Sequence, residues 1–291
     1  MAAVKRSPLL NRKATTTLGW ITSHIVLIAG SFLIMIPIFW MITSSLKSEA
    51  DLYIFPPKWL PDPPLWRNYI DSMVIYPFPR YFLNTTVITV LSILGTLISC
   101  ALAAFGFSHF RFPGRDAVFI ALLATMMLPG TVTLAPIYVL CFKLGWIDTY
   151  YPLIVPNFFG DAFYIFLLRQ FFVGIPAELK DSARIDGCNS LNILWRIVLP
   201  LSTPALATVA IFRFMDSWND FMGPLIYINT SIKRTVAIAL ALFQNSAQHG
   251  PPPNLNLLMA VSFISLAPCV LLFFFAQRWF IQGIVFKGLK G

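Results

Sequence analysis

The chain has 291 residues, of which 57% are hydrophobic and only 11% are charged, and its formal net charge at pH 7 is +9. A soluble domain carries about twice that share of charged residues, so the composition is typical of a membrane protein. The basic residues lie beside apolar stretches rather than in one compact patch interleaved with aromatics, which argues against nucleic-acid binding. Four scattered cysteines without paired spacing predict neither a disulfide framework nor a metal site.

The N-terminal segment, residues 1–17, is polar and basic and looks like the start of a signal peptide. The apolar run that follows, residues 18–43, is too long for a cleaved signal peptide and has no small-residue cleavage site. We therefore expect a first membrane-spanning helix that is retained as a signal anchor.

Five further apolar stretches are long enough to cross the hydrocarbon core of a bilayer. They are residues 84–107, 117–141, 151–172, 201–228 and 257–281. Pro129-Gly130 predicts a kink within the third span. The sequence thus predicts an all-α membrane protein, a polytopic bundle of six transmembrane helices over residues 18–281.

The basic residues also suggest an orientation. If the N-terminus lies inside, the inner loops and both termini hold more Lys and Arg than the outer loops. The long proline-rich and aromatic segment 44–83 and the segment 229–256 are then outer loops, which either lie at the membrane interface or contribute to a docking face for an external protein. The short basic turn 109–115 is an inner loop, for which a role as a positive topology anchor is sufficient.

A hydrophilic island, residues 175–204, separates the fourth and fifth spans. Pro176 favours a helix start, and Glu178 and Asp181 place negative charge near the positive end of that helix. Gly187 can adopt a left-handed conformation and end it. This helix is too short to cross a bilayer or to be stable alone, so it needs a partner. A second short apolar segment, residues 191–199, ends at Pro200.

The island resembles the cytoplasmic loop of permease subunits in bacterial binding-protein-dependent ABC importers. That loop reads E-A-A, three residues, Gly, nine residues, I-x-L-P. Here Asp181-Ser182-Ala183, Gly187 and Ile197-Val198-Leu199-Pro200 occupy these places, with Asp for Glu, Ser for the first Ala and Cys188 where a small residue is usual.

The resemblance implies a coupling helix that docks into a cleft on an ATPase subunit and carries its motion into the membrane. The residues implied in this coupling are Glu178, Asp181, Ser182, Ala183, Asp186, Gly187, Ile197, Leu199 and Pro200. The alternative is an interfacial amphipathic hairpin without a partner.

Charged residues within spans need an explanation, because each is costly if it faces lipid. Arg213, Asp216 and Asp220 lie at i, i+3 and i+7 and would share one face of a continuous helix, with Arg213 and Asp216 spaced for a local ion pair. That face either lines the translocation path or its gate, or packs against a second permease subunit. Asp161 in the fourth span has the same two interpretations.

Two further segments narrow the resemblance. Trp218-Asn219-Asp220-Phe221, followed by Gly223-Pro224-Leu225, resembles a W-N-(D/E)-F…P-L pattern of carbohydrate-uptake permeases, in particular the smaller permease of the maltose system. The basic tail also resembles the ending of sugar-type permeases, in which it reaches into the ATPase dimer interface. Its candidate contact residues are Lys287, Lys290 and Gly291. The alternative for the tail is a frayed basic anchor.

The chain has no G-x-x-x-x-G-K-[ST] phosphate loop and no G-x-S-x-G nucleophile elbow. We therefore expect a chain that is not an enzyme and holds no cofactor. The resemblance implies two ATPase subunits that bind ATP and Mg, a second homologous permease, an extracytoplasmic solute-binding protein and a location in the inner or plasma membrane of a bacterium or archaeon.

The predicted function is the permease subunit of an ATP-driven importer, forming half of the pathway for a sugar or sugar-like solute. Its parts are a cytoplasmic segment 1–17, a permease domain 18–281 with a coupling loop 173–203, and a cytoplasmic tail 282–291. The alternative is a self-contained secondary transporter, which would need an internal repeat and broken helices at mid-membrane; the halves show no repeat. A membrane-embedded enzyme is disfavoured because no acid, base or metal set converges.

Overall fold

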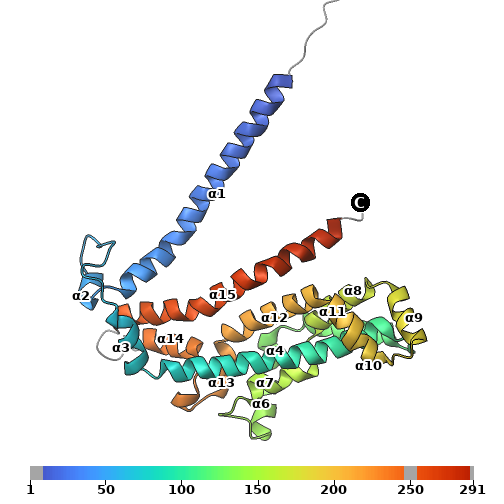
Figure 1. The fold of residues 1–291 in the computed structure, drawn as a ribbon. Coiled ribbons are helices and arrows are strands. Elements are labelled where there is room, and N and C mark those ends of the chain that lie inside the picture. The colour runs from blue at the N-terminus through green and yellow to red at the C-terminus, as the bar shows by residue number, and fades with distance from the viewer. Residues whose placement is uncertain (1–8, 246–253, 289–291) are drawn as a thin grey trace, which may run out of the picture. The chain divides into compact units, whose positions relative to one another are not determined.

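The computed structural model describes residues 9–245 and 254–288, which form helices joined by turns, with no strand among these residues (Figure 1). The predicted all-α class is confirmed. The chain divides into two units, Met1–Asp71 with Asn254–Phe263, and Ser72–Pro253 with Ile264–Gly291.

The first unit contains α1 (Leu9–Ser45), the short α2 (Glu49–Leu52) and the start of α3 (Arg67–Ile75). The segment Gly19–Ser45 is long and apolar enough to cross a membrane, in agreement with the predicted first span. Within this segment residues 19–37 are exposed except Gly30, which leaves their apolar surface available to lipid or to another protein, whereas Thr43, Ser44 and Ser45 are buried.

A buried polar network orders the loop after α1. Lys47 is 1% exposed; its ammonium group donates to the Lys58 carbonyl and lies 4.2 Å from the centre of a Trp40 ring. Asn68 donates to the carbonyls of Ser45 and Lys47 at 2.8 and 2.9 Å. The predicted outer loop 44–83 is therefore a folded segment, and α4 begins inside it.

The second unit is built around α4 (Phe78–His109), which starts six residues before the predicted second span. Its buried positions include small residues, among them Ser92, Gly95, Ala101 and Ala104. Small side chains allow close approach between helices in a membrane protein. α8 (Ala162–Val173) and α12 (Thr203–Trp218) pack against α4.

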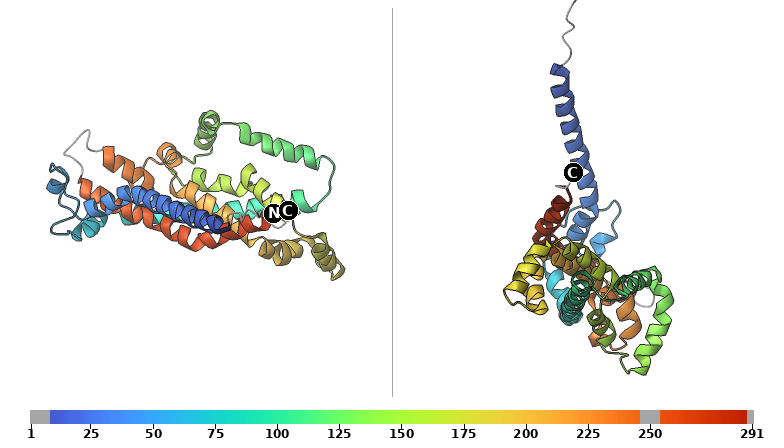
Figure 2. Two further views of the ribbon diagram at one scale, coloured as in Figure 1. Left: turned by 90° about the horizontal axis from the view of Figure 1, so that it is seen from above. Right: turned by 90° about the vertical axis from the view of Figure 1, so that its right-hand side faces the viewer.

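The predicted third span is broken rather than kinked. α5 (Arg115–Ala124) and the 3₁₀ turn η1 (Thr125–Met127) are followed, after Leu128-Pro129, by α6 (Gly130–Lys143) at an angle of 98° (Figure 2). Pro129 has an extended backbone, φ −61° and ψ 131°, and its ring disfavours a helical conformation at Leu128. The predicted position of the break is confirmed.

The fourth span, Tyr151–Val173, consists of α7 (Tyr151–Ile154), the 3₁₀ turn η2 (Val155–Phe159) and α8. η2 packs against α4, where Gly95 lies directly below the Phe158 ring. The interruption ends at Gly160, whose φ of +90° favours glycine.

The predicted fifth span, residues 201–228, is not one helix. α12 ends at Trp218, and α13 (Met222–Tyr227) starts separately after three residues. The Asp220 side chain accepts a hydrogen bond from the Gly223 N–H at 3.0 Å, which favours a new helix start over continuation.

The interpretation of residues 229–256 as a loop was also wrong, because they contain α14 (Val236–Asn245). This helix is too short to span a bilayer, but it buries Val236, Ile238, Ala239 and Phe243. The last span lies in α15 (Leu255–Gly288), which continues through most of the predicted tail. Among the described residues four helices could span a membrane, or six if each bent pair counts as one span.

Replacing Gly95 by Ala should lower the unfolding temperature of the purified protein in detergent. The added Cβ would lie 2.6 Å from Phe158 Cδ2, and overpacking of this kind costs about 1–3 kcal/mol. Gly106→Ala is the matched control, because Gly106 lies in the same helix with nothing within 4 Å of the new Cβ. Equal losses in both variants would contradict the proposed role of the α4–η2 contact.

Candidate functional site

The hydrophilic island forms a short helix, α9 (Ala177–Ile185), preceded by Pro176 in an extended conformation. The Cys188 N–H donates to the Ala183 carbonyl at 2.9 Å, and the Gly187 N–H donates to the Arg184 carbonyl at 3.0 Å. With Gly187 at φ +81°, these two bonds form a Schellman motif that ends α9. The predicted helix start and the predicted stop at Gly187 are confirmed.

The second half of the island is helical too. The Asn189 side chain accepts from the Asn192 N–H at 2.8 Å and caps α10 (Ser190–Ile193). A π-helical stretch, η3 (Leu194–Val198), and α11 (Leu199–Leu201) follow, and this run meets α12 at 79°. The predicted segment 191–199 is therefore helical, and a sharp bend at Ser202 separates it from α12.

α9 is anchored in the core of the second unit by one small side chain. Ala183 is buried in a core cluster with Phe172 of α8 and Ile193 and Leu194 of the following segment. The same cluster includes Cys100 and Ala104 of α4. The buried side of α9 thus belongs to the same core cluster as parts of α8 and α4.

Most of the predicted coupling residues face outward. Of the residues predicted to couple to a partner, Ala183 points inward and Ile197 and Leu199 are half-buried. The other six are exposed: Glu178, Asp181, Ser182, Asp186, Gly187 and Pro200.

This surface also has an apolar part, whose residues were not among those predicted to couple to a partner. Leu179, Ile185, Leu191 and Trp195 are exposed, and Ile185 reaches 86%. The large apolar side chains beside the exposed carboxylates form a mixed surface suited to a protein partner.

The charged residues of the fifth span do not pair as predicted. Asp216 accepts a hydrogen bond from the Tyr164 hydroxyl at 2.6 Å, which joins α12 to α8. None of the ion pairs in the described ranges joins Arg213 to Asp216, and the half-buried Arg213 has no hydrogen bond at Nε. Asp220 lies beyond the end of α12, so the predicted shared face of the three residues was wrong.

The remaining candidates of this region have local structural roles. Asp161 caps α8 by accepting from the Phe163 and Tyr164 N–H groups at 2.9 and 3.4 Å. Trp218 is buried, stacks on Phe214 and donates to the Ser265 carbonyl at 3.2 Å. Asn219 donates to the Met215 carbonyl at the end of α12.

Asp148 is the centre of a hydrogen-bonded cluster that was not predicted from the sequence. Its carboxylate accepts from the N–H groups of Asn229 and Thr230, from the Thr230 hydroxyl at 2.6 Å and from Lys233 at 2.9 Å. This cluster ties the turn before α7 to the turn after α13. No spacing rule links residues more than 80 positions apart, so the sequence carried no signal for it.

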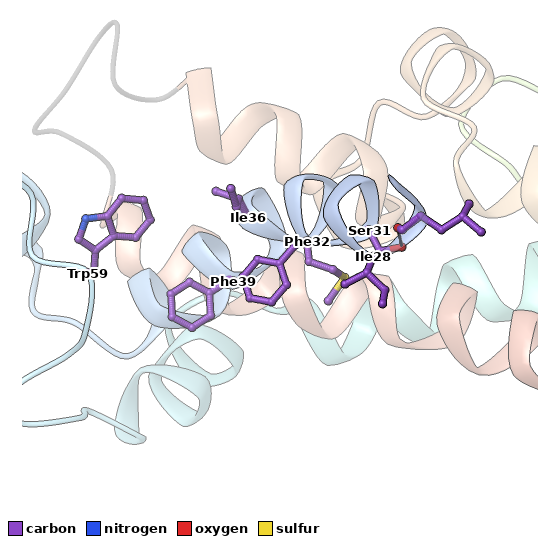
Figure 3. Close-up of a pocket in the computed structure, with 8 residues that line it drawn as sticks. Ile28, Ser31, Phe32, Ile36, Phe39 and Trp59 are labelled. Atoms are coloured by element: carbon purple, nitrogen blue, oxygen red, sulfur yellow. Dashed lines mark hydrogen bonds between the residues drawn. The ribbon is translucent and has the colours of Figure 1, made fainter. Parts of the chain in front are cut away.

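A pocket lies beside α1 in the first unit. α1 and Trp59 line an apolar pocket of about 720 Å³, whose lining includes Phe32, Phe39 and Ile36 (Figure 3).

No group of three or more His, Cys, Asp or Glu residues able to hold a metal occurs in the described part of the chain. Lys290, Gly291 and the Lys287 side chain lie outside the described residues.

The stability of the Asp148 cluster should depend on pH. Hydrogen bonds from the Thr230 hydroxyl and N–H, followed by that from Lys233, hold the pKa of Asp148 well below its usual value. A depressed folded-state pKa stabilises the protein above the unfolded-state pKa of about 3.9, and this stabilisation is lost as pH falls.

The unfolding temperature of the wild type should therefore fall more between about pH 5 and pH 3 than that of Asp148→Asn, whose side chain does not titrate. Asp62→Asn, an exposed carboxylate in another loop, is the control and should follow the wild type. Parallel curves for the wild type and Asp148→Asn would contradict this role.

The model of the family described as binding-protein-dependent transport system inner membrane component matches residues 95–285. The chain is 32% identical to the probable ABC transporter permease protein YurM of Bacillus subtilis (strain 168), over 99% of this chain and 93% of that protein. It is 30% identical to the arabinooligosaccharides transport system permease protein AraQ of Halalkalibacterium halodurans, over 97% and 100%.

The sn-glycerol-3-phosphate transport system permease protein UgpE of Rhizobium meliloti (strain 1021) is 32% identical, over 90% of this chain and 94% of that protein. Among solved structures, a chain of a bacterial ABC transporter involved in alginate import has the same fold, with a TM-score of 0.81, 22% identity, and coverage of 96% of this chain and 100% of that chain. Together with the helices described above, the family match over residues 95–285 establishes that the chain belongs to the binding-protein-dependent ABC transporter permeases, which are membrane components.

Proposed function

We propose that this permease forms half of the translocation pathway of an ATP-driven importer for a sugar or sugar-like solute. It would work with a second homologous permease, two ATPase subunits that bind ATP and Mg, and an extracytoplasmic solute-binding protein. The similarity to arabinooligosaccharide and glycerol-3-phosphate permeases supports the solute class. A second solved structure of similar fold, a bacterial alginate ABC transporter in complex with a pentasaccharide-bound periplasmic protein, supports the binding-protein partner.

The observation that carries the coupling role is the two-sided character of α9. One small residue, Ala183, is buried in the core, whereas Glu178, Asp181, Asp186 and Ile185 face outward. The surface available to an ATPase subunit is thus connected to the membrane helices by a rigid packing contact rather than by a flexible loop.

Such a contact supports a rigid-body mechanism. Closure of the ATPase dimer on ATP would draw α9 toward its counterpart on the second permease, and α8 and α4 would follow because they share its core cluster. ATP hydrolysis would then release α9 and reset the helices. The chain itself would neither bind nor hydrolyse the nucleotide.

The orientation that fits this mechanism places α9, the turn 109–115 and both termini in the cytoplasm. The excess of Lys and Arg in these segments supports it. The Asp148 cluster and α14 would then lie on the outer side, where a binding protein delivers solute.

The charged residues near the end of α12 are proposed to hold the helices in register rather than to contact solute. Asp216 binds Tyr164, Asp220 caps α13 and Asp161 caps α8. Each carboxylate already has a donor from this chain, which supports a packing role.

The overall proposal is tested by isolating the tagged chain from its native membrane in mild detergent. The preparation should contain Mg-dependent ATPase activity that increases when the solute-loaded binding protein is added. A chain that elutes alone, folded, and moves solute in vesicles without ATP would be a secondary transporter, contrary to the proposal.

Gly187→Pro should abolish this stimulation while the protein level in the membrane stays normal. Proline can neither adopt φ +81° nor donate the bond to Arg184, so the end of α9 would be lost. The matched control is Gly145→Pro, because Gly145 ends α6 in the same motif, at φ +68° and with its N–H on Phe142. Unchanged uptake in Gly187→Pro would count against coupling through α9.

Asp220→Leu should reduce recovery of the intact complex, because it removes the oxygen that caps α13. Asp220→Asn keeps an oxygen for the Gly223 N–H and should assemble normally. The measurement is the yield of the second permease and the ATPase with the tagged chain. An intact complex that fails to transport in both variants would instead place Asp220 in the solute path.

A further inference from the structure

A basic cleft lies at one end of the second unit, between the turn after α4 and the base of α9. Its volume is about 630 Å³. Five cationic side chains but only one carboxylate, Asp181, line it. The cationic residues are Arg111, Arg115, Arg169, Lys180 and Arg184. The remaining lining comes from the 107–110 segment, Val173 and Ala177.

Internal pairing leaves part of this positive charge free. Arg184 donates to Asp181 at 3.2 Å, and Arg115 donates to Asp116 at 2.8 Å. Arg111 and Lys180, by contrast, have no ion-pair partner within the described ranges. Because the carboxylate in the lining, Asp181, is paired with Arg184, the two remaining cations favour an anion from outside the chain.

His109 is arranged as part of the same wall. Its ring stacks on Phe105 at 4.5 Å between centroids, and its Nε2 lies 2.7 Å from an Arg184 guanidinium nitrogen. A guanidinium only donates, so Nε2 accepts and the imidazole is neutral. The hydrogen bond joins α9 to the end of α4 across the cleft.

The position of the cleft favours one chemical class of anion. Three candidate spans have an end here: one finishes at His109, the next begins at Arg115 and another finishes at Val173. The cleft thus lies where lipid headgroups meet the ends of membrane helices. Phe110, Phe112 and Val173 are exposed beside the charged side chains. An apolar rim next to a cationic cavity matches a ligand with acyl chains and a phosphate.

We propose that this cleft binds the phosphate of an anionic phospholipid headgroup. The phosphate is held by Arg111 from the turn and Lys180 from α9, and the acyl chains lie along the exposed aromatic side chains. Binding of the lipid is independent of the proposed transport function. Under that function, a headgroup bridging the turn and α9 restricts the movement of the coupling helix.

The test is lipid binding to the complete complex, delipidated in detergent and titrated in native mass spectrometry with phosphatidylglycerol or phosphatidylcholine. Phosphatidylglycerol should bind more tightly than phosphatidylcholine. Arg111→Gln/Lys180→Gln should weaken phosphatidylglycerol binding roughly 10- to 30-fold and leave phosphatidylcholine binding unchanged.

The matched control is Arg80→Gln/Lys143→Gln, which removes the same charge from exposed positions outside the cleft. It should retain the affinity of the wild type for phosphatidylglycerol. The single variant Arg111→Gln, which lies off α9 on an exposed turn, should show a smaller loss. An equal loss in the control would overturn the proposal, because the effect would come from net charge alone.

Two other results would also overturn it. Inorganic phosphate that competes with phosphatidylglycerol at similar concentration would show a site for free phosphate rather than for lipid. Loss of the ATPase from the Arg111→Gln/Lys180→Gln complex with unchanged phosphatidylglycerol affinity would show that the cleft receives an acidic side chain of the partner.

Discussion

The burial of Ala183 in one core cluster with Ile193, Leu194 and Phe172 is the interaction on which the placement of α9 depends. α9 has nine residues, and a helix of that length is not stable alone. Its stability therefore comes from this contact and from the motif at Gly187. Because the buried residue is an alanine, the α9 backbone lies close to the core, and little side-chain rearrangement can absorb a displacement.

The route from this contact into the membrane is short. Ala183, α8 and the C-terminal third of α4 belong to one core cluster, and Asp216 then joins α8 to α12 through Tyr164. The donor to Asp216 is a neutral hydroxyl, so the bond positions two helices without burying an ion pair, whose desolvation cost can exceed its Coulomb energy. α9 is thus linked to α8 and α4 through one core cluster, and α8 to α12 through one hydrogen bond.

The sequence predicted features with a local cause and missed those that depend on distant residues. The start of α9, its stop at Gly187 and the break at Pro129 follow from backbone preferences of single residues, and the structure has them. The division of the fifth span at Asp220 was missed because the residues on both sides of Asp220 are apolar. The new helix start becomes evident only from the hydrogen bond that the Gly223 N–H donates to Asp220. Helix α14 was missed because it is apolar but too short for the span criterion. The Asp148 cluster and the basic cleft combine residues far apart in the chain, which no periodicity reports.

The carboxylates of the second unit show why charges near apolar spans need not be transport residues. A buried or half-buried carboxylate without donors is costly, and a nearby Arg is the partner that spacing rules suggest. Here Asp161 and Asp220 instead accept from free N–H groups at helix starts, which need an acceptor in any case. The same hydrogen bond thus gives the carboxylate a donor and gives the N–H group at the helix start an acceptor. Acidic residues are therefore tolerated where a span is interrupted and a new helix begins. Arg213, whose Nε has no partner from the described residues, is then the charge in this region that the fold of the single chain leaves unexplained.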